Sequence, residues 1–347
     1  MIRKIIGEDI AEIARSVGVG QLRKKTVLIA GAGGFLPAYM VETLLYLNET
    51  QSCNCQIIGL VRSPEKAVRR FAHYASRTDF SLIPGDVSSL ENELPRADII
   101  IHAASPASPK YYGRDPVGVM RANILGMNNL LELARQWKTE SFLYFSSGEV
   151  YGQLAASAPP AKETDYGYID IANVRSCYAE SKRAAETLGV SYWIQHGVPC
   201  KIVRPFHTYG PGMALDDGRV FADFVADVVN RRNIILKSDG SAIRAFCYLA
   251  DAVRAFFTVL LNGIPGQAYN VGNPQGALSI LELSELLVDM SPGLRVERLV
   301  GHSDAGYLQS PIARNVPDVS LLNSLGWSPK YSPQEGFART IRSFLET

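Results

Sequence analysis

The sequence has no hydrophobic run long enough to cross a membrane. A spanning helix needs about 20 consecutive, mostly apolar residues, and no stretch of this chain approaches that length. Residues 1–25 contain Glu8, Asp9 and Glu12 among several basic residues, and they lack the continuous apolar segment of a signal peptide. We therefore expect a cytoplasmic protein with no membrane insertion.

An excess of charge of one sign is also missing. The chain has 35 Lys and Arg against 34 Asp and Glu, which gives a formal net charge of +1. A nucleic-acid-binding protein normally carries a broad basic surface. This balance argues against a nucleic-acid partner, but it is compatible with a small anionic ligand, because a pocket needs only a few well-placed arginines.

Cysteine is scarce, and its spacing shows no framework. There are five cysteines, an odd number, and the close pair Cys53 and Cys55 is not followed by a second Cys or His pair with zinc-like spacing. We expect free thiols in a reducing compartment and no metal site.

Short apolar runs alternate with helix-like segments up to about residue 205, which is typical of a parallel sheet covered on both faces. The sequence therefore predicts an α/β fold: a Rossmann-type doubly wound parallel sheet with a smaller, interleaved α/β substrate-binding lobe. The expected strands are 26–30, 56–61, 80–83, 97–103, 141–146 and 200–204, and the long helices are 37–47, 117–137 and 178–196.

The expected boundaries follow from the same pattern. Residues 1–24 form an added helical extension, because Ile6, Ile10 and Ile13 share one helix face. Residues 25–205 form the dinucleotide-binding domain, to which 245–275 contribute, and 206–244 with 276–347 form the second lobe. Ser332-Pro333-Gln334-Glu335 predicts an N-cap and capping box for a last helix that ends near residue 345.

A glycine-rich turn joins the first strand to the first helix of the sheet. Gly31 and Gly34 occupy the first two positions of a G-x-x-G-x-x-G pattern, and Pro37 stands at the third. Such glycines let the backbone approach a pyrophosphate at a helix N-terminus. The pattern favours a dinucleotide site over an ordinary glycine turn.

Two residues at strand ends bear on the identity of the cofactor. The second strand ends at Arg62 without the carboxylate that usually holds the ribose of NAD. We expect NAD, with NADP left open because Arg62 can pair with a 2′-phosphate. Asp86 ends the third strand, where it either accepts a hydrogen bond from adenine or caps its own loop.

Tyr178 and Lys182 lie four residues apart at the start of a long helix and share one face. A nearby ammonium lowers the pKa of a phenol, so such a tyrosine can take a hydroxyl proton while hydride leaves for a nicotinamide. The alternative is that Tyr178 and Lys182 have no catalytic role and lie on a solvent-exposed face of the helix. Ser146 and Ser147, which follow the fifth strand, favour the catalytic interpretation because a hydroxyl there can reach the same substrate oxygen.

In this order the motifs resemble the extended short-chain dehydrogenases, the NAD-dependent epimerase/dehydratase family, from about residue 25 to the C-terminus. They are the 31–37 turn, Asp86, His102-Ala103-Ala104, Ser146-Ser147, Tyr178-x-x-x-Lys182 and Arg204-Pro205. The resemblance implies transient oxidation of a sugar carbon by bound NAD(P)+, chemistry at the neighbouring carbon and return of the hydride. It also implies a nucleotide-diphosphate sugar as substrate and a homodimer formed through two long helices of each subunit.

Within that family the chain is most similar to the UDP-glucuronate decarboxylases. The similar segments are 102–109, 175–187, 208–220 and 239–248. The implied catalytic residues are Ser147, Glu149, Tyr178 and Lys182. The implied cofactor residues are Gly31, Gly33, Gly34, Phe35, Leu36, Arg62, Asp86, Val87, Ala103, Ala104, Ser105, Tyr178, Lys182 and Pro205. The implied substrate residues are Ser108, Tyr112, His207, Arg219, Arg244 and Arg314, with Arg219 and Arg244 at the nucleotide and Arg314 at the sugar.

The chain also departs from that group. Gly148 stands where decarboxylases have serine and dehydratases an aspartic acid, His207 replaces a substrate-binding asparagine, and Gly212 replaces an arginine. Without the acid at position 148, elimination of water lacks its proton donor. The alternatives that stay open are a 4,6-dehydratase, an epimerase, a 4-ketoreductase and a non-enzymatic NAD(P)-binding protein.

Overall fold

The apolar runs pair side by side into one parallel sheet. In this computed structural model, which describes residues 4–90, 93–155, 157–298 and 312–346, the sheet has seven strands in the order β10-β6-β5-β4-β1-β2-β3. They are β1 (Thr26–Ala30), β2 (Gln56–Val61), β3 (Phe80–Pro84), β4 (Ile99–His102), β5 (Ser141–Phe145), β6 (Cys200–Pro205) and β10 (Ala268–Val271). The strand order reverses between β1 and β4, so the predicted Rossmann-type sheet is confirmed.

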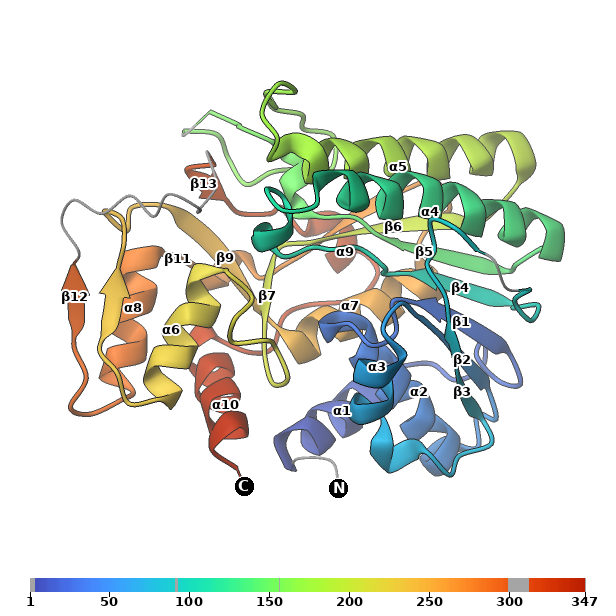
Figure 1. The fold of residues 1–347 in the computed structure, drawn as a ribbon, viewed down its shortest axis with the longest axis horizontal. Helices are drawn as coiled ribbons and strands as arrows, with labels where there is room; N and C mark the ends of the chain where they lie inside the picture. The colour runs from blue at the N-terminus through green and yellow to red at the C-terminus, as the bar shows by residue number, and fades with distance from the viewer. Residues whose placement is uncertain (1–3, 91–92, 156, 299–311, 347) are drawn as a thin grey trace.

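Helices cover both faces of the sheet. Because successive side chains of a strand point to opposite sides, each strand contributes to two hydrophobic cores. In β1, Val27 and Ile29 belong to one hydrophobic core, whereas Leu28 and Ala30 belong to the other. Figure 1 shows α4 (Pro116–Trp137) and α5 (Ser176–His196) on one face, and α2 (Phe35–Gln51), α3 (Pro64–Arg70) and α7 (Leu249–Asn262) on the other.

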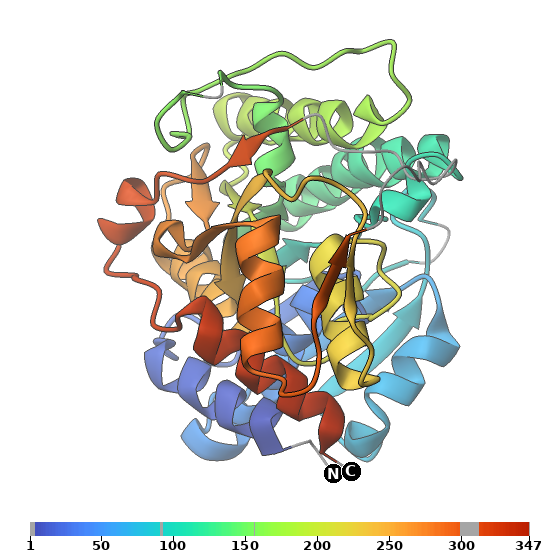
Figure 2. The same ribbon diagram turned by 90° about the vertical axis from the view of Figure 1, so that its left-hand side faces the viewer.

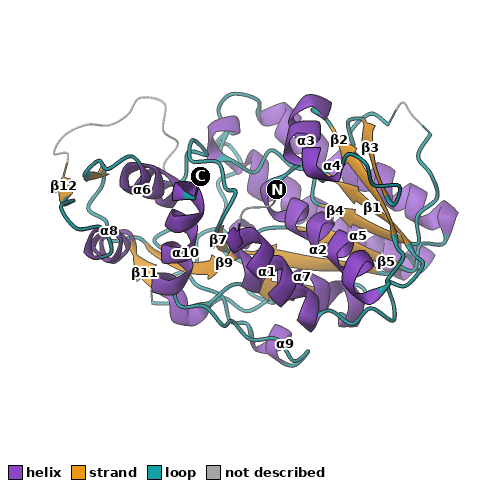
Figure 3. Cartoon of the chain, turned by 90° about the horizontal axis from the view of Figure 1, so that it is seen from below, coloured by secondary structure: helices purple, strands orange, loops and turns teal. Residues whose placement is uncertain are grey.

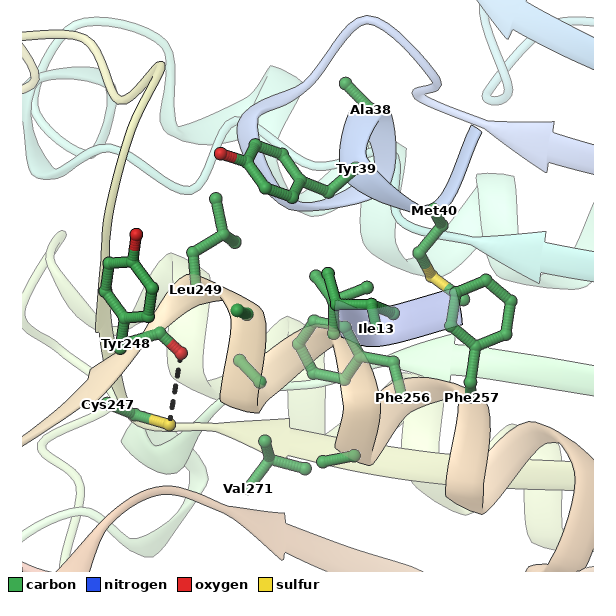
Figure 4. Close-up of a cluster of buried hydrophobic side chains, with 14 of the residues drawn as sticks. Ile13, Ala38, Tyr39, Met40, Cys247, Tyr248, Leu249, Phe256, Phe257 and Val271 are labelled. Carbon is green, nitrogen blue, oxygen red and sulfur yellow. Dashed lines mark hydrogen bonds between the residues drawn. The ribbon is translucent and has the colours of Figure 1, made fainter. Parts of the chain in front are cut away.

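The N-terminal helix α1 (Lys4–Ser16) adds a layer over α2 and α7, seen from below in Figure 3. Ile13 lies in the same buried cluster as Met40 of α2 and as Phe256 and Phe257 of α7 (Figure 4). The predicted helix is confirmed. The sequence pattern did not predict that Asp9, on the same face, is buried as well.

The second lobe is built around β9 (Ile243–Tyr248), which pairs with β7 (His207–Tyr209), β11 (Ala277–Ser279) and β13 (Arg314–Asn315). A separate pair joins β8 (Ile234–Leu236) to β12 (Val296–Arg298). Figures 1 and 2 show α6 (Val220–Val229), α8 (Ile280–Asp289) and α10 (Pro333–Leu345) in this lobe, while α9 (Ser320–Asn323) lies beside β10. The chain returns to the main sheet through α7 and β10, so the two parts are interleaved.

The start of α10 follows the predicted capping chemistry. Ser332 accepts a hydrogen bond from the backbone N–H of Glu335, whose carboxylate accepts one from the N–H of Ser332, and Pro333 occupies the first turn. The predicted capping box is therefore confirmed. It satisfies N–H groups that a helix start leaves without intrahelical partners.

Among the described residues, no helix combines the length and the apolar character that crossing a bilayer requires.

Candidate active site

One large cavity lies at the carboxyl ends of the parallel strands, where ligands bind in open α/β sheets. Its volume is about 1200 Å³, which exceeds the roughly 300–1,000 Å³ of a typical small-molecule site and can hold a dinucleotide beside a second ligand. All of the predicted cofactor residues line it, as do the predicted catalytic residues Ser147, Glu149, Tyr178 and Lys182. The predicted cofactor residues are Gly31, Gly33, Gly34, Phe35, Leu36, Arg62, Asp86, Val87, Ala103, Ala104, Ser105, Tyr178, Lys182 and Pro205.

The glycine-rich turn forms one wall of the cavity. Gly31 has a φ of +83°, in the left-handed region that side chains disfavour. A Cβ there would lie 2.8 Å from both the Cα and the N of Ala104. Gly34 is the N-cap of α2, and Pro37 sits in the first helical turn, where proline is tolerated. These residues fit a dinucleotide, because they leave room for a pyrophosphate at the N-terminus of α2.

Asp86 and Arg62 lie at the end of the cavity formed after β2 and β3. The Oδ1 of Asp86 accepts hydrogen bonds of 2.8 Å from the N–H and from the hydroxyl of Ser88. Burial raises the pKa of Asp86, but these bonds and the charges of Arg62 and Arg121 outweigh it, so that the pKa is lowered. Asp86 is therefore an ionised acceptor that also caps its own loop.

The tyrosine and the lysine of the predicted pair are both buried. Burial raises the pKa of Tyr178 to about 12, although a hydrogen bond with Ser147 lowers it. Burial also lowers the pKa of Lys182 to about 7. The ammonium donates a 2.6 Å hydrogen bond to the carbonyl oxygen of Phe145 and lies 5.7 Å from the centre of the Tyr178 ring. We expected Lys182 to lower the pKa of the phenol, but burial dominates here.

Glu149 lies in a short 3-10 helix (Gly148–Tyr151) directly after β5. Its backbone N–H donates a 3.2 Å hydrogen bond to the hydroxyl oxygen of Ser147. Its two carboxylate oxygens each accept a 3.0 Å hydrogen bond from Arg175. A Cβ added at Gly148 would lie 3.1 Å from ring carbons of Phe206, so this ring crowds the position where the resemblance leads us to expect a serine or an aspartic acid.

The predicted nucleotide end of the cavity carries two arginines on the second lobe. Arg219 forms a 2.8 Å ion pair with Asp217. Arg244, in β9, donates to the carbonyl oxygens of Ile243 at 2.8 Å and of Ile312 at 2.7 Å. Both arginines line the cavity, so the second lobe contributes cationic groups to it.

Three other predicted substrate residues also line the cavity. The hydroxyl of Ser108 donates to the carbonyl oxygen of Asp217, and that of Tyr112 donates to the carbonyl oxygen of Ala107 at 3.0 Å. His207 is neutral, because burial and then the charges of Arg244 and Arg219 hold its pKa well below the usual value.

The structure does not bring Arg314 to this cavity. Arg314 lies in β13 and lines a separate small pocket with Tyr151, Gly152 and Leu154. Its neighbours Ile312 and Asn315 do line the large cavity. In a short strand, alternate residues face opposite sides, so proximity in sequence to cavity residues does not decide where Arg314 points.

Sequence reasoning did not single out Arg175 as a site residue. It lies directly before α5 and three residues before Tyr178, and it lines the cavity. The i, i+3 spacing was the available signal, because residues three apart share a helix face. Within the described part of the chain, no cluster of three or more His, Cys, Asp or Glu side chains is arranged to hold a metal ion.

A doubly wound sheet, a glycine turn and a tyrosine–lysine pair at the carboxyl edge define the class of the extended short-chain dehydrogenases. Residues 27–272 match the sequence model of the family described as "NAD dependent epimerase/dehydratase family". The chain belongs to this family.

Its similarity to named relatives covers most of the chain. It is 34% identical over 330 residues to UDP-glucuronic acid decarboxylase 1 of Arabidopsis thaliana, a match that covers 94% of this chain and 71% of that protein. It is also 34% identical to UDP-glucuronic acid decarboxylase 3 of the same plant, over 89% of this chain and 86% of that protein.

Solved structures share the fold at lower identity. UDP-glucuronic acid 4-epimerase from Bacillus cereus superposes with a TM-score of 0.77 and 22% identity, over 92% of this chain and 99% of that chain. DesIV, the dTDP-glucose 4,6-dehydratase from Streptomyces venezuelae, superposes with a TM-score of 0.77 and 22% identity, over 93% of this chain and 97% of that chain. These neighbours support the fold and leave the reaction to be argued from the site.

Proposed function

We propose that this protein is an NAD-dependent UDP-glucuronate decarboxylase. The observation that carries the proposal is the single cavity that joins the glycine turn, the pair of Tyr178 and Lys182, and a carboxylate, Glu149, to two arginines of the second lobe. The similarity to the plant UDP-glucuronic acid decarboxylases supports the substrate. The substrate is an anionic nucleotide-diphosphate sugar, which fits the cationic end of the cavity.

The first task of the site is removal of a proton from the hydroxyl at carbon 4 of the sugar. The glycine turn at residues 31–37 would hold NAD+, which would supply the hydride acceptor for that carbon. Tyr178 takes the hydroxyl proton, and Ser147, which shares a hydrogen bond with Tyr178, holds the same substrate oxygen. Lys182 lies beside the phenol and stabilises its ionised form when charged. On return of the hydride, Tyr178 gives the proton back.

The second task is chemistry at carbon 5. A ketone at carbon 4 makes the carboxylate on carbon 5 a β-keto acid, which loses CO2 and leaves an enolate. Glu149 lies beside Ser147 at the end of β5, so it is placed to order the water that protonates carbon 5, or to move that proton itself. The products are then CO2 and a UDP-pentose.

Position 148 argues against the 4,6-dehydratase alternative. Elimination of water from carbon 6 needs an acid that protonates the leaving hydroxyl, and Gly148 has no side chain. A Cβ at this position would lie 3.1 Å from the Phe206 ring, so any side chain there would need the ring to shift by a few tenths of an ångström. This feature favours loss of CO2, a leaving group that needs no protonation.

The cofactor proposal is NAD, with NADP as the competing ligand at Arg62. Arg62 lines the cavity after β2 and β2 ends without a carboxylate, so the ribose hydroxyls are not held in the usual manner. A cofactor that is regenerated within each turnover can stay bound. Mass spectrometry of the ligand released by denaturing the purified protein distinguishes NAD from NADP.

We further propose a homodimer formed through α4 and α5, with the protein in the cytoplasm. These helices lie side by side on one face of the sheet (Figure 1). They carry exposed apolar side chains that include Met120, Leu125, Val190 and Ile194, as a self-associating surface does. The free, buried cysteines are compatible with a reducing compartment. Sedimentation of Ile194→Glu against the parent protein tests the dimer.

The decisive experiment for the activity uses UDP-glucuronate and the purified holoenzyme. We expect release of CO2 and appearance of a UDP-pentose. Both can be monitored by nuclear magnetic resonance. Conversion to an epimer with all six sugar carbons retained would instead identify a 4-epimerase, and absence of any sugar turnover would favour the non-enzymatic alternative.

A further inference from the structure

Arg175 joins the two parts of the catalytic machinery. Its guanidinium holds Glu149 by two hydrogen bonds of 3.0 Å, one to each carboxylate oxygen. The side chains of both residues are largely shielded, with 12% of Arg175 and 22% of Glu149 exposed. A two-pronged pair of this kind fixes the plane of a carboxylate as well as its position.

The same guanidinium also reaches the tyrosine side of the site. It lies 5.7 Å from the centre of the Tyr112 ring. Tyr112 in turn stacks on Tyr178, with ring centres 5.0 Å apart. Arg175 precedes Tyr178 by three residues at the start of α5. Glu149, on the turn after β5, is therefore tied to the helix that carries Tyr178.

A glutamate side chain on a short turn has several rotamers of similar energy. The hydrogen bonds of the turn's own backbone include those from the Glu149 N–H to the Ser147 hydroxyl and from the Gly152 N–H to the Glu149 carbonyl oxygen. They fix the turn but do not involve the Glu149 carboxylate. The orientation comes from Arg175.

We infer that Arg175 is a positioning residue: it holds Glu149 in the orientation needed at carbon 5 of the sugar. The resemblance placed Arg314 at the sugar, but the structure places Arg175 beside the carboxylate that would act there. This inference rests on the proposed function, because the role of Glu149 at carbon 5 belongs to it.

The first test needs no substrate. In the NAD-loaded protein, Arg175→Gln should increase amide hydrogen exchange across residues 148–151 by about tenfold, because the clamp on Glu149 is lost. The matched control is Arg295→Gln, which removes an exposed pair with Glu297 and should leave this segment unchanged. Unchanged exchange in Arg175→Gln would overturn the positioning role, whatever the substrate.

The second test separates positioning from general damage. On UDP-glucuronate, Arg175→Gln should lower kcat by about 10²-fold, the cost of a misplaced catalytic group, with KM changed little. Arg175→Lys should recover part of the loss. The double variant Glu149→Gln/Arg175→Gln should be no slower than Glu149→Gln alone, because residues that act as a unit are not additive.

The two hypotheses fail in different ways. If the parent protein leaves UDP-glucuronate unchanged while exchange at 148–151 still depends on Arg175, the proposed substrate is wrong and the positioning role stands. If the parent protein decarboxylates the substrate but the losses from Arg175→Gln and Glu149→Gln multiply, Arg175 does not act through Glu149 and the inference is wrong.

Discussion

The rings of Tyr112 and Tyr178 are stacked, with centres 5.0 Å apart and planes inclined by 17°. Tyr112 is itself fully buried, and its hydroxyl donates to the carbonyl oxygen of Ala107. This stack shields the phenol of Tyr178 from water, and burial is the main reason that its pKa is raised to about 12. Because a phenol that keeps its proton cannot accept another, the proposed role of Tyr178 requires a lower pKa of this group when cofactor and substrate are bound.

Replacing Tyr178 with phenylalanine tests this role. The ring still stacks on Tyr112, so we expect the fold and the affinity for NAD to be retained. Turnover should fall by about 10²–10⁴-fold, the usual contribution of a general acid or base. Stopped-flow absorbance of reduced nicotinamide measures the step directly. Near-normal turnover on the true substrate would show that Tyr178 is only a structural residue of α5.

Gly31 offers a test of the cofactor site. In Gly31→Val, the new Cβ would lie 2.8 Å from backbone atoms of Ala104, which is too close. A β-branched residue also strongly disfavours the φ of +83° found at this position. Calorimetry should detect no NAD binding at concentrations that saturate the parent protein. Gly20→Val is the control, because a Cβ at Gly20 meets nothing within 4 Å. Unchanged affinity for both NAD and NADP would refute the assignment of the turn.

Much of this site could be predicted because parallel strands bring their carboxyl ends to one edge. Once 26–30, 56–61, 80–83 and 141–146 are recognised as strands, the residues after them must meet. Arg314 shows the limit of this reasoning. It was placed by resemblance, and the orientation of a two-residue strand depends on its pairing with β9, which no local pattern reveals.

The burial of Asp9 shows a second limit. Its partners are Tyr248, which donates a 2.7 Å hydrogen bond, and Arg339, at 2.6 Å. They lie 239 and 330 residues away in the chain, so the helical pattern of α1 identifies the buried face but not the polar contact on it. Packing of α1 beside α10 brings these groups together.

Asp9 also predicts a pH dependence of stability. Burial raises the pKa of its carboxyl from the usual 3.8 to about 6, against the opposing effects of Tyr248 and Arg339. Between these values the folded chain keeps a proton that the unfolded chain has lost. The stabilisation is thus fully present below about pH 4 and is lost as the pH rises through 6. The shift corresponds to roughly 3 kcal/mol.

Chemical unfolding of the parent protein and of Asp9→Asn between pH 4 and 7 measures this effect. Because asparagine does not titrate, the free energy of unfolding of the parent should decline relative to the variant as the pH rises. Glu8→Gln is the control from the same helix: its side chain is 47% exposed and pairs with Arg339 at 3.2 Å. A difference that grows in the opposite direction would mean that the ion pair with Arg339 outweighs desolvation.

Glu149 provides the prediction that best separates the candidate reactions. Glu149→Gln keeps the size of the side chain and one hydrogen-bond acceptor for Arg175, but it removes the base. In the proposed mechanism, hydride transfer from carbon 4 depends on Tyr178, Ser147 and Lys182, so it should still occur. The steps at carbon 5 should slow by about 10²-fold or more, because they lose a general acid or base.

Mixing the NAD-loaded variant with UDP-glucuronate should therefore produce nicotinamide absorbance that rises as in the parent protein and then persists, with little UDP-pentose formed. Glu180→Gln is the matched control, because Glu180 forms an ion pair with Arg183 on the same helix as Tyr178 and does not belong to the cavity. If Glu149→Gln turns over at the normal rate, the Glu149 carboxylate does not take part in chemistry at carbon 5. A 4-epimerase or a ketoreductase, which needs only the Tyr178 machinery at carbon 4, would then describe the site better.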